Sequence, residues 1–484
     1  MPFYPTPDLD DGYDVTDLYG VDPRYGSLGD VVDFLRAARE HGLRVIADLV
    51  VNHTSDRHPW FREARASRES PYRSFYVWSD ERPEERPDDV IFPGVEDSIW
   101  DYDEEAGQWF LHRFYGHQPD LNVADARVRE EIFKALGFWL ELGFSGFRVD
   151  AVPYFIERLG ADDEAGGDPH ELLRDLRGFL SRRSGDAVLL GEVNLEPNDL
   201  ARYFGAAGDE LHVLFDFIVN QALYLSLVCE QAEPLVRALE ARPATPDANG
   251  WATFVRNHDE LTLDKLSEAE REEVFGALAP DEDMRIFGRG IRRRVPPMLG
   301  GDRRRLELVY SLLFSLPGTP VLLYGEEIGM GENLAASARM SVRTPMQWRA
   351  APGGGFSDAD PADLCVPVAE GDYAPARVNV ESQRHDPESL LNWTTRIVGL
   401  RRQCPEIGWG EWAVLPVDEP AVLAHRCDWE GRTFVAAHNL SGEPLTVRLD
   451  LDDVAEPRNL FTGEPEGPGL ELEPFGYRWL RSAN

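Results

Sequence analysis

The chain has 484 residues and a formal net charge of −38, from 87 acidic and 49 basic residues. Such a charge repels phosphate backbones and anionic lipid surfaces, so nucleic acid and membranes are excluded as expected partners. With 43% hydrophobic residues, and without the apolar run of about eighteen residues that a membrane span needs, the sequence predicts a large globular core. We expect two or three modules, because the length exceeds that of one ordinary domain.

The sequence shows no signal pattern of charged, apolar and small residues at either end, so we expect the cytoplasm as its location. Nearly all basic residues are arginine, which fits either a GC-rich genome or an adaptation to high salt. The cysteines show neither CxxC spacing nor a disulfide pattern, so free buried thiols are expected at Cys229, Cys365, Cys404 and Cys427.

Short apolar segments alternate with amphipathic ones along most of the chain, which predicts a parallel α/β fold. Strands that end in polar or charged residues are expected within 43–53, 146–152, 187–194, 211–217, 251–259 and 319–327. Residues 126–143 are predicted to form a helix behind an Asp125 cap, because apolar residues recur there at helical spacing. The last helix is expected over 389–403.

Two segments interrupt this alternation. Residues 54–118 are rich in Trp, Tyr, Pro and charge, with a hairpin expected around Glu105 to Gly107, and they predict an inserted subdomain. Residues 408–484 alternate apolar and polar positions, which predicts a separate antiparallel β-sandwich domain. The α/β domain then comprises residues 1–53 and 119–407.

A charged pair follows the apolar run in "GFRVDAV". Arg148 and Asp150 stand two residues apart, so in a strand their side chains point to the same side. The guanidinium group is expected to keep Asp150 ionised, and an ionised, positioned carboxylate can act as a nucleophile. This dipeptide alone is equally compatible with a buried structural ion pair.

Other acidic and imidazole residues also stand at the ends of predicted strands, namely Asp48, Asn52, His53, Glu192, His258 and Asp259. In a parallel barrel the carboxyl ends of the strands form the active face. Each residue by itself could be a strand cap or part of an ion pair. Their coincidence at strand ends favours a catalytic site.

The segments "DLVVNH", "GFRVDAV", "GEVN" and "VRNHDE", in this order and at these separations, resemble the four signature regions of the α-amylase superfamily, glycoside hydrolase family 13. Within it, "DDGYDVTDLYG", "HRFYGHQPDLN", "SLPGTPVLLYGEE" and "VRTPMQW" are most similar to trehalose synthases and their near relatives. The likeness covers nearly the whole chain. It implies a (β/α)8 TIM barrel, with the subdomain inserted after barrel strand 3 and the β-sandwich at the C-terminus.

The resemblance implies that Asp150 is the nucleophile, Glu192 the general acid/base and Asp259 a carboxylate that stabilises the transition state. Retaining glycoside chemistry needs a nucleophilic carboxylate and a second carboxyl about 5 Å away. Glu192 follows apolar or small residues, and a desolvated surrounding is expected to raise its pKa toward that of an acid competent near neutral pH. Asp259 would offset the positive charge of the oxocarbenium-like state.

The substrate-binding residues that the resemblance implies surround a terminal glucose, and they are Asp10, Tyr13, His53, Arg148, His258 and Arg343. Tyr13 would stack on the sugar ring. Arg343 would pair with Asp10 and close the pocket, so that the enzyme acts from the non-reducing end.

A structural calcium site is also implied, and no organic cofactor is expected. Its ligands would be the side chains of Asn52, Asp120 and Glu157 and the backbone carbonyls of Tyr154 and Phe155. Such oxygen ligands suit a hard cation. The alternative is hydrogen bonding between insert and barrel without a metal.

The chain departs from the family at two places. It opens with "MPFYPTPDLDDGYDV", a segment that family members reach only after a first strand, a first helix and most of a second strand. We expect the chain to be truncated or its start codon wrongly assigned, and a genuine shortened relative with impaired catalysis is the alternative. The segment "ERLGADDEAGGDPHELL" is short and acidic, where trehalose synthases carry a longer loop that shapes the acceptor side.

The function that the resemblance implies is that of a retaining α-glucosyl enzyme on short α-glucosides, which interconverts maltose and trehalose through a β-glucosyl intermediate on Asp150. An α-glucosidase that hydrolyses maltose uses the same catalytic residues and stays open. Two non-enzymatic classes compete: family relatives that serve as ectodomains of transporters, and a sugar-binding module. The former lose the catalytic carboxylates, and the latter would not need Glu192. The sequence does not indicate an oligomeric state.

Overall fold

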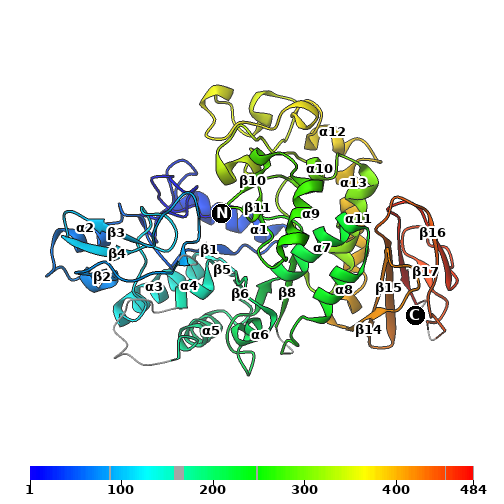
Figure 1. Cartoon of the computed structure of the whole chain (residues 1–484), viewed down its shortest axis with the longest axis horizontal. Helices are drawn as coiled ribbons and strands as arrows, with labels where there is room; N and C mark the ends of the chain where they lie inside the picture. Colours follow the sequence, from blue (N-terminus) through cyan, green and yellow to red (C-terminus); the bar gives the residue numbers. More distant parts are fainter. Residues whose placement is uncertain (87–88, 157–167, 247–248, 453, 483–484) are drawn as a thin grey trace. The chain divides into compact units, whose positions relative to one another are not determined.

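The computed structural model describes residues 1–86, 89–156, 168–246, 249–452 and 454–482 (Figure 1). The chain divides into two compact units, and each is described by itself. The first unit comprises Met1–Phe215 and Pro243–Gly250, and the second comprises Asp216–Arg242 and Trp251–Asn484.

Parallel strands form the centre of the first unit, and they are β1 (Ala47–Leu49), β5 (Gly146–Val149), β6 (Val188–Gly191) and β7 (Val213–Phe215). β5 pairs with β1 on one side and with β6 on the other, and β6 also pairs with β7. Because all these strands run the same way, the residues that follow them gather at one edge of the sheet. Asp150 and Glu192 directly follow β5 and β6.

Helices alternate with these strands, as the sequence predicts, and they are α1 (Leu28–Glu40), α3 (Ala126–Leu142), α4 (Val152–Ile156), α5 (Glu171–Arg183) and α6 (Pro197–Leu200). The helix expected over 126–143 is confirmed, and the Asp125 side chain accepts a hydrogen bond from the Arg127 N–H as its cap. It ends at Gly143, whose φ of 116° is the left-handed conformation that glycine adopts without strain. Its inner face is buried through residues such as Ile132 and Trp139.

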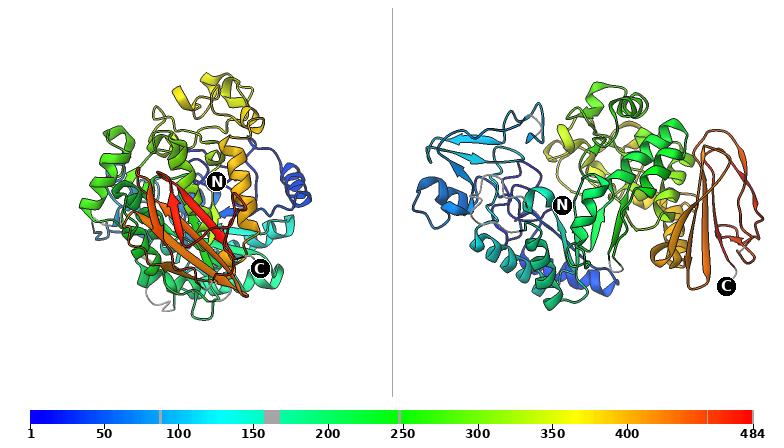
Figure 2. Two further views of the ribbon diagram at one scale, coloured as in Figure 1. Left: turned by 90° about the vertical axis from the view of Figure 1, so that its right-hand side faces the viewer. Right: turned by 60° about the horizontal axis from the view of Figure 1, so that its bottom comes forward.

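Residues of the predicted insert form α2 (Pro59–Ala66) and a small antiparallel sheet of β2 (Trp78–Ser79), β4 (Gln108–Leu111) and β3 (Trp100–Asp103), in that order. The hairpin between β3 and β4 is confirmed. Figure 2 shows α2 beside this sheet, and the buried ring of Phe61 packs against Trp78 and Phe110.

In the second unit, β8 (Gly250–Phe254) pairs in parallel with β12 (Thr319–Val321). A short antiparallel sheet follows the order β10 (Arg285–Ile286), β11 (Gly290–Ile291) and β9 (Leu261–Thr262). The helices of this unit are α7 (Phe217–Cys229), α8 (Glu233–Glu240), α9 (Glu268–Leu278), α10 (Val295–Met298), α11 (Arg303–Ser315), α12 (Val380–Arg384), α13 (Leu390–Arg402) and α14 (Glu406–Trp409). α7 and α11 are buried on most of their surface and contribute to one large apolar core.

The C-terminal segment forms antiparallel sheets, which the sequence predicted (Figures 1 and 2). One sheet has the order β13 (Glu411–Leu415), β14 (Val422–Trp429), β15 (Arg432–Asn439), β19 (Tyr477–Arg481) and β17 (Arg458–Asn459), and the other pairs β16 (Leu445–Arg448) with β18 (Gly469–Leu472). Both sheets supply residues to one core, for example Val435 and Leu470. The bounds of the predicted domains stay predictions.

Each predicted strand is present, but it is shorter than the apolar run that indicated it. The helix expected as the last one is α13, and the short helix α14 follows it. The cysteines are free, as expected, but Cys365 is exposed because it lies in a loop, whereas Cys404 and Cys427 are buried. No helix in the described part of the chain is long and apolar enough to cross a membrane.

A close approach of β5 and β6 provides a test of this packing. Gly146 has a φ of 142°, and a Cβ atom there would lie 2.1 Å from the Val188 carbonyl oxygen. Gly146→Ala is therefore expected to lower the free energy of unfolding by about 1–3 kcal/mol, as overpacking does. Urea denaturation measures this change. Gly185→Ala is the matched control, because no atom lies within 4 Å of its added Cβ, and an equal loss in both variants would contradict the prediction.

Candidate active site

The side chain of Arg148 lies between the carboxylates of Asp48, Asp150 and Glu192 in the first unit. Its Nη1 donates hydrogen bonds to Asp48 Oδ1 at 2.6 Å and to Asp150 Oδ1 at 2.8 Å. Its Nη2 donates to Glu192 Oε2 at 2.6 Å. The expected pair of Arg148 and Asp150 is present, and it is one part of a larger network.

The register of the parallel strands brings these side chains together. Asp48 on β1 is the partner of Arg148 on β5, so their side chains are neighbours on the sheet. At the ends of the strands, Asp150 N–H donates to the Leu49 carbonyl at 3.2 Å, and Glu192 N–H donates to the Val149 carbonyl at 3.1 Å. Asp150 and Glu192 therefore start their loops at the same level of the sheet.

The charges around Arg148 favour the ionised forms of its partners. Burial acts to lower the pKa of this guanidinium group, but the negative charges of Glu192, Asp48 and Asp150 raise it well above its ordinary value. The group stays charged, and a neighbouring positive charge stabilises a carboxylate.

The desolvation that the sequence predicts for Glu192 is partial. Its side chain is 21% exposed and forms an ion pair with Arg148. The reason is that the apolar residues before it lie within β6, while Glu192 itself follows the strand and reaches toward Arg148.

Tyr13 and His53 join the same hydrogen-bonded group. The Tyr13 hydroxyl accepts from Arg148 Nη1 at 2.9 Å, and the Tyr13 carbonyl lies 3.2 Å from His53 Nε2. Burial lowers the pKa of His53 to about 3, so this imidazole is neutral at physiological pH. Asp10 contacts Tyr13 through the backbone, because the Asp10 carbonyl accepts a hydrogen bond from the Tyr13 N–H. The Asp10 carboxylate accepts a hydrogen bond from Gln118 Nε2 at 2.9 Å.

Asp259 is held by arginines in the second unit. Its Oδ1 lies 2.9 Å from Arg343 Nη2 and 3.1 Å from Arg339 Nη1. His258 Nε2 lies 3.5 Å from Asp259 Oδ2, and the His258 carbonyl accepts from Arg343 Nε at 2.9 Å. The predicted residues of this unit, His258, Asp259 and Arg343, therefore lie together.

Some members of the site were not assigned from the sequence. Asp48 was recognised only as a residue at a strand end, and Arg339 was not recognised at all. The signal for Asp48 is its position two residues into β1, opposite Arg148. Arg339 lies four residues before Arg343 in a 3-10 segment, and no motif distinguishes it from surface arginines.

Two of the contacts expected from the sequence are between residues of different units. The pairing of Arg343 with Asp10, and the meeting of Asp259 with Asp150 and Glu192, stay predictions.

The described residues of the expected calcium site lie around Arg113. Asp120 Oδ1 accepts from Asn52 Nδ2 at 3.2 Å and from the Arg113 N–H at 3.1 Å. Arg113 Nη1 donates to the Tyr154 carbonyl at 3.2 Å. Burial raises the pKa of Asp120 to about 6.

The remaining expected calcium ligands are the Phe155 carbonyl and the Glu157 side chain. Phe155 is buried in α4, and Glu157 lies outside the described residues. No group of at least three His, Cys, Asp or Glu residues suited to a metal ion occurs in the described ranges, but the expected set relies mainly on amide and carbonyl oxygens.

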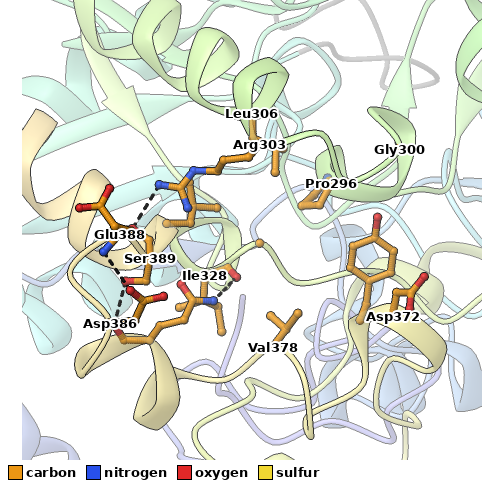
Figure 3. A pocket seen from close by; sticks show the side chains of 15 residues that line it. Pro296, Gly300, Arg303, Leu306, Ile328, Asp372, Val378, Asp386, Glu388 and Ser389 are labelled. Atoms are coloured by element: carbon orange, nitrogen blue, oxygen red, sulfur yellow. Dashed lines mark hydrogen bonds between the residues drawn. The ribbon is translucent and has the colours of Figure 1, made fainter.

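A cavity of about 500 Å³ in the second unit contains none of the predicted site residues (Figure 3). Pro296, Leu306 and Ile328 line its apolar part. Among its polar groups, Arg303 donates to Glu307 Oε1 and to the Ser389 carbonyl, so its guanidinium group already has partners within the chain. The candidate site remains the group of carboxylates around Arg148 and Asp259.

A model of the alpha amylase catalytic-domain family matches residues 1–274 and 291–410. The chain is 41% identical over 501 residues to the trehalose synthase of Pimelobacter sp. (strain R48), covering 99% of this chain and 87% of that protein. It is 39% identical over 495 residues to the trehalose synthase/amylase TreS of Mycobacterium tuberculosis, covering 99% of this chain and 82% of that protein.

Solved structures show the same fold. The alpha-amylase from H. orenii matches with a TM-score of 0.78 and 24% identity, over 100% of this chain and 89% of that chain. The trehalulose synthase MutB from Pseudomonas mesoacidophila MX-45 matches with a TM-score of 0.78 and 23% identity, over 99% and 91% of the two chains. The predicted fold class is confirmed.

Replacing the central guanidinium group tests the network. Arg148→Met leaves carboxylates without their counter-charge, and it is expected to lower the free energy of unfolding at pH 7 by about 3–5 kcal/mol. The loss should shrink as the pH falls, because the uncompensated carboxylates then become protonated. Urea denaturation at several pH values measures both effects. In the control Arg44→Met, which removes an exposed ion pair with Asp186, a loss of at most about 1 kcal/mol is expected; similar losses for both variants would refute the role of Arg148.

Proposed function

The chain belongs to the alpha-amylase family, glycoside hydrolase family 13, and on this premise we propose that it interconverts maltose and trehalose. The observation that carries this function is an identity of about 40% to trehalose synthases along 99% of the chain. Its substrates are then short α-glucosides with a terminal glucose.

In the proposed first step, the Asp150 carboxylate attacks the anomeric carbon of the non-reducing glucose of maltose. The bond from this carbon to the glycosidic oxygen breaks, and Glu192 gives its proton to that oxygen. A β-glucosyl ester on Asp150 and a free glucose result. Arg148 supports this step because it keeps Asp150 ionised and holds both carboxylates on one guanidinium group.

In the proposed second step, the released glucose turns and attacks through its anomeric hydroxyl. Glu192, now ionised, takes the proton of this hydroxyl, the ester bond to Asp150 breaks, and an α,α-1,1 bond forms. The contact of Glu192 with Arg148 suits this step, since a nearby positive charge stabilises the carboxylate that must act as base. Water must stay out meanwhile, because it would release a second glucose.

Asp259 is proposed to stabilise the positive charge of both transition states. Arg343 and Arg339 hold its carboxylate in a fixed position. Tyr13, His53, Asp10 and His258 are proposed to bind the hydroxyl groups and the face of the terminal glucose. His53 would do so as a neutral imidazole, because burial lowers its pKa to about 3.

Calcium is proposed as a structural ion of the first unit. Asp120 offers a carboxylate and Tyr154 a backbone carbonyl, both in contact with Arg113, and these are oxygen donors that calcium prefers. The Asn52 amide donates through its nitrogen to Asp120, so its side chain would have to turn its oxygen toward the ion. The raised pKa of Asp120 indicates a carboxylate whose charge is only partly compensated. The ion would tie the insert to the sheet and take no part in the chemical steps.

The function is tested by incubating the chain with maltose and following the products by NMR. Trehalose is expected as the main early product, and Asp150→Ala should reduce turnover by several orders of magnitude because the nucleophile is gone. Asp33→Ala, on the exposed face of α1, is the control and should keep full activity. Free glucose without any trehalose signal would instead make the protein an α-glucosidase, and activity of Asp150→Ala within about tenfold of the parent would refute the mechanism.

Chelation tests the calcium proposal. Removal of a bound ion destabilises the folded state, so a chelator should lower the melting temperature and added calcium should restore it. Asp120→Asn should abolish this response, while Asp80→Asn, at an exposed position of the insert, should retain it. An unchanged melting curve with chelator, together with no metal in elemental analysis, would count against the ion.

A further inference from the structure

Arg256 and Arg294 are buried in the second unit, each with 1% of its surface exposed. The hydrogen bonds that their guanidinium groups donate go to backbone carbonyls and to one side-chain amide. The Glu332 carboxylate accepts from Arg294 through the backbone N–H of that residue. A buried charge is costly without a partner of opposite charge. Burial indeed lowers the pKa of Arg256. These arginines therefore need an anion nearby.

The carbonyls that these arginines hold belong to the loops of the candidate site. Arg256 Nη2 donates to the Asp259 carbonyl at 2.6 Å. Arg294 Nε donates to the Val342 carbonyl at 2.9 Å, directly before Arg343 in the chain. Since Arg343 pairs with the Asp259 carboxylate, the two buried guanidinium groups hold both sides of this ion pair.

Glu326 is placed to supply the opposite charge. It lies in the 3-10 segment Glu326–Ile328, after β12, and it is 1% exposed. Its Oε2 accepts from the Leu323 N–H at 2.9 Å. Its Oε1 is a buried atom without a hydrogen-bond partner among the described residues, and so are Arg294 Nη2 and the Tyr310 hydroxyl. The Tyr324 carbonyl, two residues before Glu326, accepts from Arg294 Nη1 at 2.8 Å, so Arg294 also contacts the Glu326 loop.

The electrostatics agree with this placement. Burial raises the pKa of Glu326 to about 8, while the positive charges of Arg294 and Arg256 act against this rise. Glu327 raises it further, and the buried hydroxyls of Tyr224 and Tyr310 also interact with Glu326. Glu260 is another anion that acts on Arg256.

We propose that Glu326 is a positioning residue for Asp259, which acts as the counter-charge of Arg256 and Arg294 and thereby keeps the Asp259–Arg343 pair in place. It does not touch the substrate. The proposal rests on the proposed function, because it takes Asp259 as the carboxylate that faces the developing positive charge. Ionised Glu326 draws both guanidinium groups toward it, and protonated Glu326 does so less.

The test compares the parent with Glu326→Gln at pH 6 and pH 9 in the consumption of maltose. At pH 9 the variant lacks a negative charge that the parent carries, so kcat is expected to fall about 10- to 100-fold with a smaller change in KM, as misplacement of a catalytic group does. At pH 6 the parent carboxyl is protonated and resembles glutamine, so both proteins should fold and react alike. The kcat of the parent divided by the kcat of Glu326→Gln should thus rise as the pH increases through about 8.

Glu381→Gln is the control, since it removes an exposed carboxylate of α12 in the same unit and should give a ratio that stays flat with pH. In an Asp259→Asn background, adding Glu326→Gln should lower kcat little further, because both substitutions act through Asp259. A ratio that is the same at every pH, or a full further loss in the Asp259→Asn background, would overturn the proposal. Consumption of maltose is measured whichever product forms, so a hydrolase outcome would refute the isomerase without affecting this test.

Discussion

The ion pairs of Arg148 are the interaction on which the first unit's site depends. A guanidinium group is planar and has several N–H donors, so it can bind carboxylates on different nitrogens at once. Arg148 uses Nη1 for Asp48 and Asp150 and Nη2 for Glu192. Without this positive charge, carboxylates crowded at one end of a sheet would repel one another, and some would take up protons. The proposed nucleophile and acid/base can therefore lie close together because β5, the strand that Asp150 follows, supplies the cation.

In the second unit, arginines hold the proposed catalytic carboxylate in a similar way. Asp259 is held by Arg343 and Arg339 on its carboxylate, and by Arg256 on its backbone carbonyl. Arginine that is buried to hold backbone oxygens still carries its charge inside the protein, and the buried acid Glu326 is proposed to balance it. In both units, the position of an acid is thus maintained by arginine side chains.

The sequence allowed much of the site to be predicted. Each predicted strand is present, and Arg148, Asp150 and Glu192 are in contact, as are His258, Asp259 and Arg343. The contacts of Arg148, Asp150 and Glu192 could be predicted because these residues lie within or directly after β5 and β6, where the direction of a side chain follows from the strand. The desolvation expected for Glu192 is only partial, because it was inferred from neighbours in the sequence, and the space around a side chain is set by groups from other strands. The likeness to a known family supplied the roles that no pattern of residues could assign.

The sequence by itself determined the alternation of strands and helices, the polar ends of the strands and the pairing of Arg148 with Asp150, because these depend on spacing of one to four residues. Only the tertiary structure decided that Asp48 also binds Arg148, through the register of β1 with β5. It likewise decided that Arg339 reaches Asp259, and that Glu326 is buried near Arg256 and Arg294. These contacts join residues far apart in the chain, and no local periodicity encodes which of the many arginines and glutamates will be buried together.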